Sequence, residues 1–187
     1  MRIISGNMKG SSLLMPPNKN TRPLKDIVKE SIFNLLMHSN QISFEIEKSN
    51  ILDLYSGIGS FGLECISRKA KSVSFVESQK EVAKILEKNI TKLKVNNKTK
   101  IYCTDVLNFI QKKTNFVFDL IFCDPPFKNN DIENLVKFIY INKLLKKNGI
   151  LIIHRNKNSK DNMPNYLNIV DKRIYGLSKI IFGNFLI

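Results

Sequence analysis

The sequence predicts an α/β fold, a mostly parallel sheet with helices on both faces, from two features. From residue 50 onward, short β-branched and aromatic runs alternate with segments whose apolar residues recur at helical spacing. This alternation is typical of parallel strands joined by helical crossovers. The last two strand-like runs, 166–173 and 178–186, are separated only by a turn near Tyr175-Gly176, so they should pair as an antiparallel hairpin.

Residues 1–40 predict a short extension in front of this alternation. Runs at 2–5 and 12–15 have the composition of two strands around a glycine-containing turn, a short β-hairpin. Pro23 stands where a helix can begin, because its missing N–H would have no partner in a first turn. A helix is then expected from Asp26 to the end of this segment, because its apolar residues fall at helical spacing.

The remaining elements belong to one compact domain, residues 41–187. Its strands before the hairpin are expected at 51–55, 73–76, 100–103, 118–123 and 149–154. Its helices are expected at 61–67, 79–93, 106–112 and 132–141.

The charge of the chain indicates an anionic partner. Lysine and arginine number 30 against 16 aspartate and glutamate residues, which gives a formal net charge of +14. Nucleic acid is the commonest partner of so basic a protein. The chain is also rich in lysine, asparagine and isoleucine, as AT-rich genomes tend to produce, so the charge alone does not decide between a partner and codon bias.

The cysteines and apolar runs indicate a cytoplasmic protein. Cys65, Cys103 and Cys123 are far apart and form no C-x-x-C pair, so we expect free thiols and no metal site. No apolar run approaches the roughly 20 residues of a membrane span, and the N-terminal apolar stretch is too short for a signal peptide. We expect a monomer without a membrane partner.

A glycine-rich turn after the first of these strands predicts a ligand site. Its glycines match the dinucleotide pattern G-x-G-x-x-G at Gly57, Gly59 and Gly62. Glu77 lies 20 positions after the first of them, at the end of the next strand, so a nicotinamide-binding domain is one interpretation. Asp53 argues against it, because a carboxylate at the strand end would repel a pyrophosphate and suits the ammonium of an amino-acid-like ligand.

The cofactor expected at this turn is S-adenosylmethionine. Asp53 would bind its ammonium group, and Glu77 would accept hydrogen bonds from two ribose hydroxyls. Asp105 would accept from the adenine amino group with Val106 against the ring, although an aspartate there also suits the N-cap of the following helix. The full set of expected cofactor contacts is Asp53, Tyr55, Gly57, Gly59, Glu77, Ser78, Asp105, Val106 and Asp124.

The motif Asp124-Pro125-Pro126-Phe127 at the end of strand 118–123 predicts the chemistry. An exocyclic base amine is a poor nucleophile, because its lone pair is delocalised into the ring. The Asp124 carboxylate and the Pro125 carbonyl can accept from its two N–H bonds and favour a pyramidal nitrogen, while Phe127 stacks on the base. The two prolines stiffen the turn. These four residues are therefore the expected catalytic group, although so short a motif also occurs in turns without function.

The N-terminal segment resembles the bacterial 16S ribosomal RNA guanine-N2 methyltransferases, the RsmD family. The glycine turn, the Asp-Pro-Pro-Phe motif and the late Tyr175-Gly176 fit the same family, so the similarity covers essentially the whole chain. The turn and the motif are shared with many methyltransferases. The segments that point to this family are Met1-Arg2-Ile3-Ile4-Ser5-Gly6, Lys9-Gly10, Thr21-Arg22-Pro23, Asp26 and Val28-Lys29-Glu30-Ser31-Ile32-Phe33-Asn34.

The resemblance implies a Rossmann-like class I methyltransferase fold with a seven-stranded sheet. It implies methylation of a guanine N2 in 16S ribosomal RNA, on the small ribosomal subunit or its assembly intermediate. Two positions depart from the family pattern: Phe127 stands where tyrosine is common, and His154 where an acidic residue is expected after the fifth strand. The expected RNA contacts are Arg2, Lys9, Arg22 and Lys128.

Two other functions fit part of the sequence. Adenine-N6 methylation of DNA uses the same Asp-Pro-Pro-Phe chemistry, but such enzymes usually add a domain that reads base edges, for which this chain has no spare length. A non-catalytic RNA-binding assembly factor could keep the fold, but binding alone does not require Asp124. His154 shares the sheet edge with the motif, and a contact with substrate is the less favoured of its roles.

Overall fold

The computed structural model describes residues 1–17, 24–112, 116–126 and 131–186. Its strands are β1 (Asn50–Leu54), β2 (Ser72–Glu77), β3 (Thr99–Cys103), β4 (Phe118–Cys123), β5 (Leu145–Asn156), β6 (Leu167–Tyr175) and β7 (Ser178–Phe185). Its helices are α1 (Asp26–His38), α2 (Ser60–Ser67), α3 (Lys80–Lys92), α4 (Val106–Gln111) and α5 (Ile132–Ile141), with a 3-10 turn, η1 (Asn96–Lys98). Every strand and helix expected after residue 50 is present.

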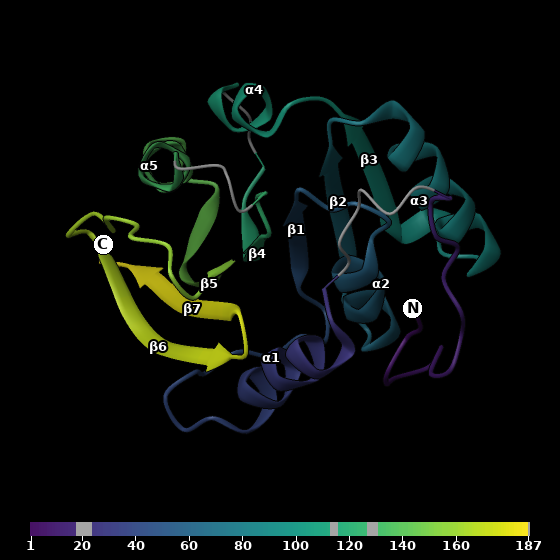
Figure 1. Cartoon of the computed structure of the whole chain (residues 1–187), viewed down its shortest axis with the longest axis horizontal. Coiled ribbons are helices and arrows are strands. Elements are labelled where there is room, and N and C mark those ends of the chain that lie inside the picture. Colours follow the sequence, from purple (N-terminus) through teal and green to yellow (C-terminus); the bar gives the residue numbers. More distant parts are fainter. Residues whose placement is uncertain (18–23, 113–115, 127–130, 187) are drawn as a thin grey trace.

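The strands form one sheet in the order β3-β2-β1-β4-β5-β7-β6 (Figure 1). Strands β1 to β5 pair in parallel, and β7 runs antiparallel to both β5 and β6. The predicted seven-stranded, mostly parallel sheet with a C-terminal antiparallel hairpin is therefore confirmed. The chain reverses its direction of travel across the sheet between β1 and β4, and in such sheets ligands bind beyond the carboxyl ends of the strands at that point.

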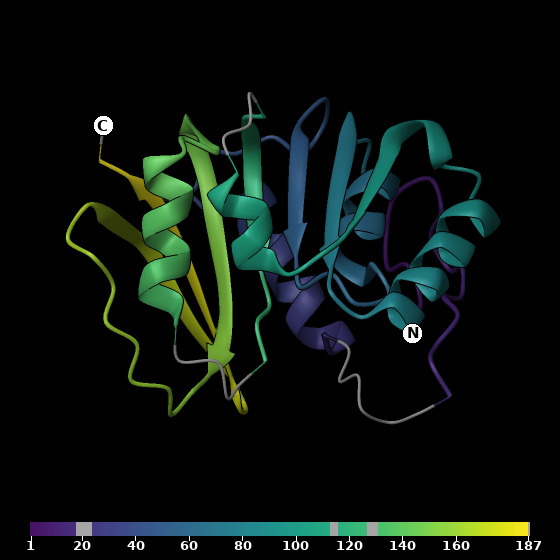
Figure 2. The same cartoon turned by 90° about the horizontal axis from the view of Figure 1, so that it is seen from above.

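Helices cover both faces of the sheet. α1, α2 and α3 contribute to the apolar cluster on one face, and α4 and α5 to the cluster on the other. Figure 2 shows α4 and α5 in front of the sheet and α1 and α2 behind it. β1 alternates between the two clusters, with Ile51 in the first and Leu52 and Leu54 in the second. The central strands are thus buried on both faces, which explains their continuous apolar runs.

The N-terminal hairpin is looser than predicted. Arg2 and Ser12 form a single antiparallel bridge, and neither arm is a regular strand. The N–H groups of Ile4 and Ser5 donate to the Glu64 carboxylate of α2, at 2.7 and 2.9 Å. Because these two groups bond a side chain, they are not available for a strand ladder.

Glu64 is the centre of a buried polar cluster that holds this segment on the domain. The Lys29 ammonium lies 3.6 Å from the Glu64 carboxylate, and both side chains are fully buried. Lys29 also donates to the Arg2 carbonyl at 2.9 Å, and Arg68 donates to Glu64 at 3.0 Å. Burial lowers the pKa of Lys29, and the neighbouring Glu64 charge opposes that shift.

β5 begins at Leu145, four residues before its expected start. The early part of this strand, Lys146-Lys147-Asn148, is exposed and polar, so its sequence has no apolar pattern that predicts a strand. The register against β4 shifts between Phe118 and Leu120, which is a bulge-type irregularity. The apolar pattern therefore located only the buried half of this strand.

The cysteines are free thiols, and two of them are buried. Burial raises the pKa of Cys65 and of Cys123 well above its usual value, so both remain protonated. None of the helices in the described part of the chain is long and apolar enough to cross a membrane.

Replacing Glu64 by alanine should strongly destabilise the protein. The change leaves the Lys29 charge buried without its carboxylate and removes the acceptor of two backbone N–H groups, so we expect a loss of about 3–5 kcal/mol in the free energy of unfolding. Denaturant titration measures this loss. Glu81→Ala is the control, because its pair with Lys84 is exposed and should contribute less than about 1 kcal/mol. Equal effects of the two substitutions would contradict this assignment.

Candidate active site

A cavity of about 380 Å³ opens at the carboxyl ends of the central strands. It lies at the point where the strand order reverses, as expected for this sheet topology. Its walls come from β1, β2, β4 and β5 and from the turn before β7. The lining residues are Met15, Leu24, Lys25, Asp53, Tyr55, Ser56, Gly57, Ile58, Ser60, Phe61, Glu77, Ser78, Gln79, Phe122, Asp124, Pro125, Pro126, His154, Leu177 and Ser178.

The loop between β1 and α2 has an unusual backbone at the cavity wall. Tyr55, Gly57 and Gly59 have positive φ angles of 60°, 54° and 82°. The positive φ of Gly59 favours glycine, and a Cβ atom there would lie 2.4 Å from the Leu86 side chain, which would have to shift. Tyr55 adopts the same region without that freedom, a form of strain that clusters at functional sites.

Glu77 joins this loop to the next strand. Its two carboxylate oxygens accept from the N–H groups of Gly57 at 2.9 Å and Gln79 at 2.8 Å. Glu77 is nearly buried. The expected acidic residue at the end of β2 therefore also fixes the shape of the glycine loop, and each oxygen keeps a second lone pair for a ligand hydroxyl.

Asp53 is the most deeply buried carboxylate of the cavity, with 1% of its surface exposed. Its Oδ2 accepts from the Gly62 N–H at 3.0 Å. Burial raises the pKa of Asp53 well above its usual value, and the charges of Asp124 and Glu77 add to this rise. Three carboxylates thus face one cavity, an arrangement that favours a cationic ligand.

Asp124 lies beside His154, which in turn contacts Ser178. Its Oδ1 is 2.7 Å from Nδ1 of His154, and Nε2 of the same ring is 2.9 Å from the Ser178 hydroxyl. The backbone N–H of Asp124 donates to the Leu54 carbonyl at 3.3 Å, which ties the motif to β1. Sequence reasoning gave His154 only a minor role and missed Ser178.

Most of the predicted site residues lie at this cavity. Those that line it are Asp53, Tyr55, Gly57, Glu77, Ser78, Asp124, Pro125 and Pro126. Phe127, Lys128 and Arg22 lie outside the described residues. Arg2 and Lys9 are exposed on the N-terminal segment, whose turn packs against Ser67, at the opposite end of α2 from the cavity.

Gly59, Asp105 and Val106 are not among the lining residues. Asp105 is the N-cap of α4, where its carboxylate accepts from the N–H groups of Leu107 at 2.8 Å and Asn108 at 3.2 Å. The helix-capping role considered for Asp105 is thus present. A contact with adenine would add a second role to an exposed side chain.

Several lining residues gave no signal in the sequence. Met15, Leu24 and Lys25 reach the cavity from the segment before α1, and Leu177 from the turn between β6 and β7. Two further lining residues, Phe61 and Phe122, stack with 3.9 Å between their ring centroids. Among the residues that line the cavity but were not predicted to form the site, only His154 gave a clue in the sequence, because it lies near the end of the strand that follows the Asp-Pro-Pro motif.

Comparison with known proteins assigns the chain to a family. The family model described as "Conserved hypothetical protein 95" matches residues 1–184. The chain belongs to this family. It is 33% identical over 179 residues to ribosomal RNA small subunit methyltransferase D of Haemophilus influenzae, covering 95% of this chain and 90% of that protein. The family expected from the N-terminal segment is thereby confirmed.

Solved structures support the fold. A candidate methyltransferase from Escherichia coli superposes with a TM-score of 0.86 at 23% identity, covering 100% of this chain and 98% of that one. A candidate methyltransferase complexed with SAH superposes with a TM-score of 0.64 at 14% identity, covering 83% of this chain and 49% of that one. At these identities the likeness is one of fold.

Asp53→Asn should stabilise the protein without ligand. A carboxyl group whose pKa is raised on folding favours the folded state below its usual pKa of 3.8, and that contribution is lost as the pH rises through the raised value. The gain from an uncharged amide should therefore be small near pH 4 and grow toward neutral pH. Thermal unfolding measures it, at about 2–4 °C per kcal/mol for a chain of this length.

Asp105→Asn is the matched control for this measurement. Asparagine and aspartate cap helices about equally well, so the melting temperature should change little at any pH. A pH-independent gain at Asp53, or a gain as large at Asp105, would show that burial of the Asp53 charge is not the cause.

Proposed function

We propose that this protein transfers a methyl group from S-adenosylmethionine to the exocyclic N2 of a guanine in 16S ribosomal RNA. The observation that carries the proposal is the placement of Asp124-Pro125-Pro126 in one cavity with Asp53 and Glu77. The methyltransferase names of its relatives, and the small-subunit RNA named for the Haemophilus influenzae protein, agree with it.

The cavity fits S-adenosylmethionine by charge and by donor set. The cofactor supplies a methyl group on a positively charged sulfur, which leaves as a neutral thioether. Asp53 would bind its ammonium group, and Glu77 would accept from its ribose hydroxyls. The three carboxylates that face this cavity make the cationic ligand favourable and would resist a pyrophosphate. This charge also disfavours the nicotinamide cofactor.

Asp124 and Pro125 would activate the amine. The carboxylate of Asp124 and the carbonyl of Pro125 would accept from its two N–H bonds, which favours a nitrogen lone pair directed out of the base plane. A neutral leaving group requires little base catalysis, so positioning is the larger contribution. Phe127 would stack on the base, a contact worth about 1–3 kcal/mol.

The charge distribution supports an RNA partner. Residues 142–187 hold nine of the 30 lysines and arginines but only two acids, Asp161 and Asp171. Both acids are already paired, Asp161 with Arg155 at 2.8 Å and Asp171 with Arg173 at 3.0 Å. About a quarter of the chain therefore carries half of the net charge. Arg155 and Lys179 are buried, so the other seven lysines and arginines of this segment, all exposed, are the ones that RNA can contact.

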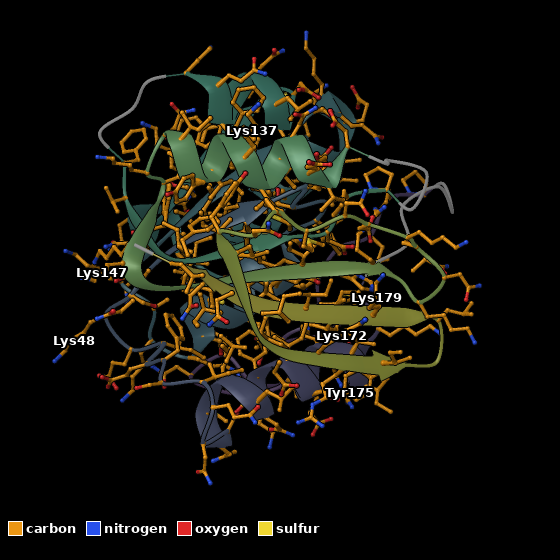
Figure 3. All side chains as sticks on the ribbon, turned by 90° about the vertical axis from the view of Figure 1, so that its left-hand side faces the viewer. Lys48, Lys137, Lys147, Lys172, Tyr175 and Lys179 are labelled. Atoms are coloured by element: carbon orange, nitrogen blue, oxygen red, sulfur yellow. The ribbon has the colours of Figure 1, made fainter. Side chains whose placement is uncertain are left out.

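Figure 3 shows the side of the molecule formed by α5, β5, β6 and β7. Lys137 of α5, Lys147 of β5 and Lys172 of β6 come from separate elements and are all exposed. Such a surface attracts a phosphate backbone without reading its sequence. We propose that it contacts the RNA of the small subunit or of its assembly intermediate, and that the protein acts as a cytoplasmic monomer.

Adenine-N6 methylation of DNA and a purely structural role in assembly make different predictions. A cavity for an amine does not by itself distinguish guanine from adenine. Incubation with labelled cofactor and small subunits from a strain without the enzyme, followed by mass spectrometry of the RNA, identifies the base. A parallel incubation with DNA is the comparison. Label on adenine of the DNA and none on the RNA, or no label on either, would reject the proposal.

Asp124→Ala should abolish most methyl transfer in this assay while cofactor affinity remains within about threefold, because the acceptor for the amine is lost and the glycine loop is intact. Glu87→Ala, which removes an exposed carboxylate of α3 away from the cavity, is the matched control and should keep full activity. Turnover by Asp124→Ala at the wild-type rate would reject the assigned mechanism.

RNA affinity should fall steeply with salt. For single strands the slope of log K against log salt is about −0.7 per phosphate contact. Replacing both Lys147 and Lys172 by glutamine should reduce the slope by roughly one to two contacts. Replacing both Lys94 and Lys98, near the opposite edge of the sheet, by glutamine should leave the slope unchanged. A slope that responds equally to both pairs would refute a localised RNA surface.

A further inference from the structure

The Asp124 carboxylate is the first member of a hydrogen-bonded chain that crosses three neighbouring strands. It follows β4, His154 lies in β5, and Ser178 begins β7, and these strands are adjacent in the sheet. His154 pairs across with Ile180, so Ser178, two residues before Ile180, projects from the same face as His154. The sheet register thus builds the alignment of the three side chains.

We propose that His154 is a positioning residue for methyl transfer, which fixes the Asp124 carboxylate so that one oxygen remains for the substrate amine, and that Ser178 fixes the His154 ring. This inference rests on the proposed function of Asp124. The side chain of His154 is 8% exposed and that of Asp124 is 22% exposed, so the pair lies at the cavity wall with little competition from water.

The distances assign a proton position to the ring. When the imidazole is neutral, its Nδ1–H donates to Oδ1 of Asp124, because an ionised carboxylate can only accept. Nε2 then accepts from the Ser178 hydroxyl. Within the described part of the chain, Oδ2 of Asp124 makes no hydrogen bond to a protein group, so it is the oxygen left for a substrate N–H.

Asp124 needs a partner to hold its carboxylate in one orientation. The two prolines stiffen the backbone of this turn, but the Asp124 carboxylate can still rotate about its last side-chain bond. A donor at 2.7 Å on one oxygen holds the carboxylate plane in place. Since a misplacement of about 1 Å can cost roughly 100-fold in rate, a fixed carboxylate is worth a dedicated partner.

Two substitutions of His154 separate positioning from packing. His154→Asn places an amide N–H near the position of Nδ1 and should keep kcat within about fivefold. His154→Leu has similar bulk but no donor and should lower kcat by roughly 10- to 100-fold, with cofactor affinity within about twofold. Wild-type kcat in His154→Leu, or equal losses in both variants, would overturn the proposal.

Combining His154→Leu with Asp124→Ala tests whether the histidine acts through the carboxylate. If it does, His154→Leu should cause no further loss once Asp124 is alanine, because residues that act as a unit are not additive. A loss of the same size in both backgrounds would show an independent role for His154 and would reject positioning.

Nitrogen-15 NMR of the imidazole tests the geometry without any activity. The chain has only two histidines, and His38→Gln assigns the second, exposed one. In the neutral ring, the His154 proton should lie on Nδ1 and should shift toward Nε2 in Asp124→Ala. A proton on Nε2 in the wild-type protein overturns the positioning inference, whereas the expected proton position in a protein that methylates no RNA rejects only the proposed function.

Discussion

The pairing of β1 with β4 is the constraint on which the candidate active site depends. These strands are far apart in sequence, and their register aligns Leu54 with Cys123, so that the residues that follow them meet at one edge. Asp53 and Asp124 are brought close enough for their charges to interact, and the N–H of Asp124 bonds the Leu54 carbonyl. Parallel pairing at the reversal of strand order thus joins Asp53, the proposed cofactor contact, to Asp124, the proposed acceptor for the amine.

The protein separates its charges by depth. Carboxylates line the cavity, while lysines such as Lys137, Lys147 and Lys172 are exposed on the surface. A cavity that favours a cation and a surface that favours a polyanion would conflict if they were mixed. Asp53 shows the cost of this separation, because burial makes its ionised form unfavourable until a cation arrives.

The fold and those parts of the site that lie close together in the chain were predictable from sequence. The residues that only strand pairing or tertiary packing brings to their positions were not. Gly57, Gly59 and Glu77 are found by a pattern because the turn and the next strand end are close in the chain. Ser178 reaches the cavity only through the β5–β7 pairing, and no local pattern encodes that register. Glu64 is similar: it reads as an ordinary polar residue of a short helix, yet it is fully buried and holds backbone sixty positions away.

The turn between β6 and β7 gives the molecule a route for evolutionary change. Leu177 and Ser178 line the cavity, but they belong to the antiparallel hairpin rather than to the loops that surround Asp53 and Glu77. Substitutions or insertions in this hairpin could reshape the cavity entrance for another nucleotide while Asp53 and Glu77, the proposed cofactor contacts, stayed unchanged. Proteins that evolve from such a chain could acquire new targets without a new binding site for the methyl donor.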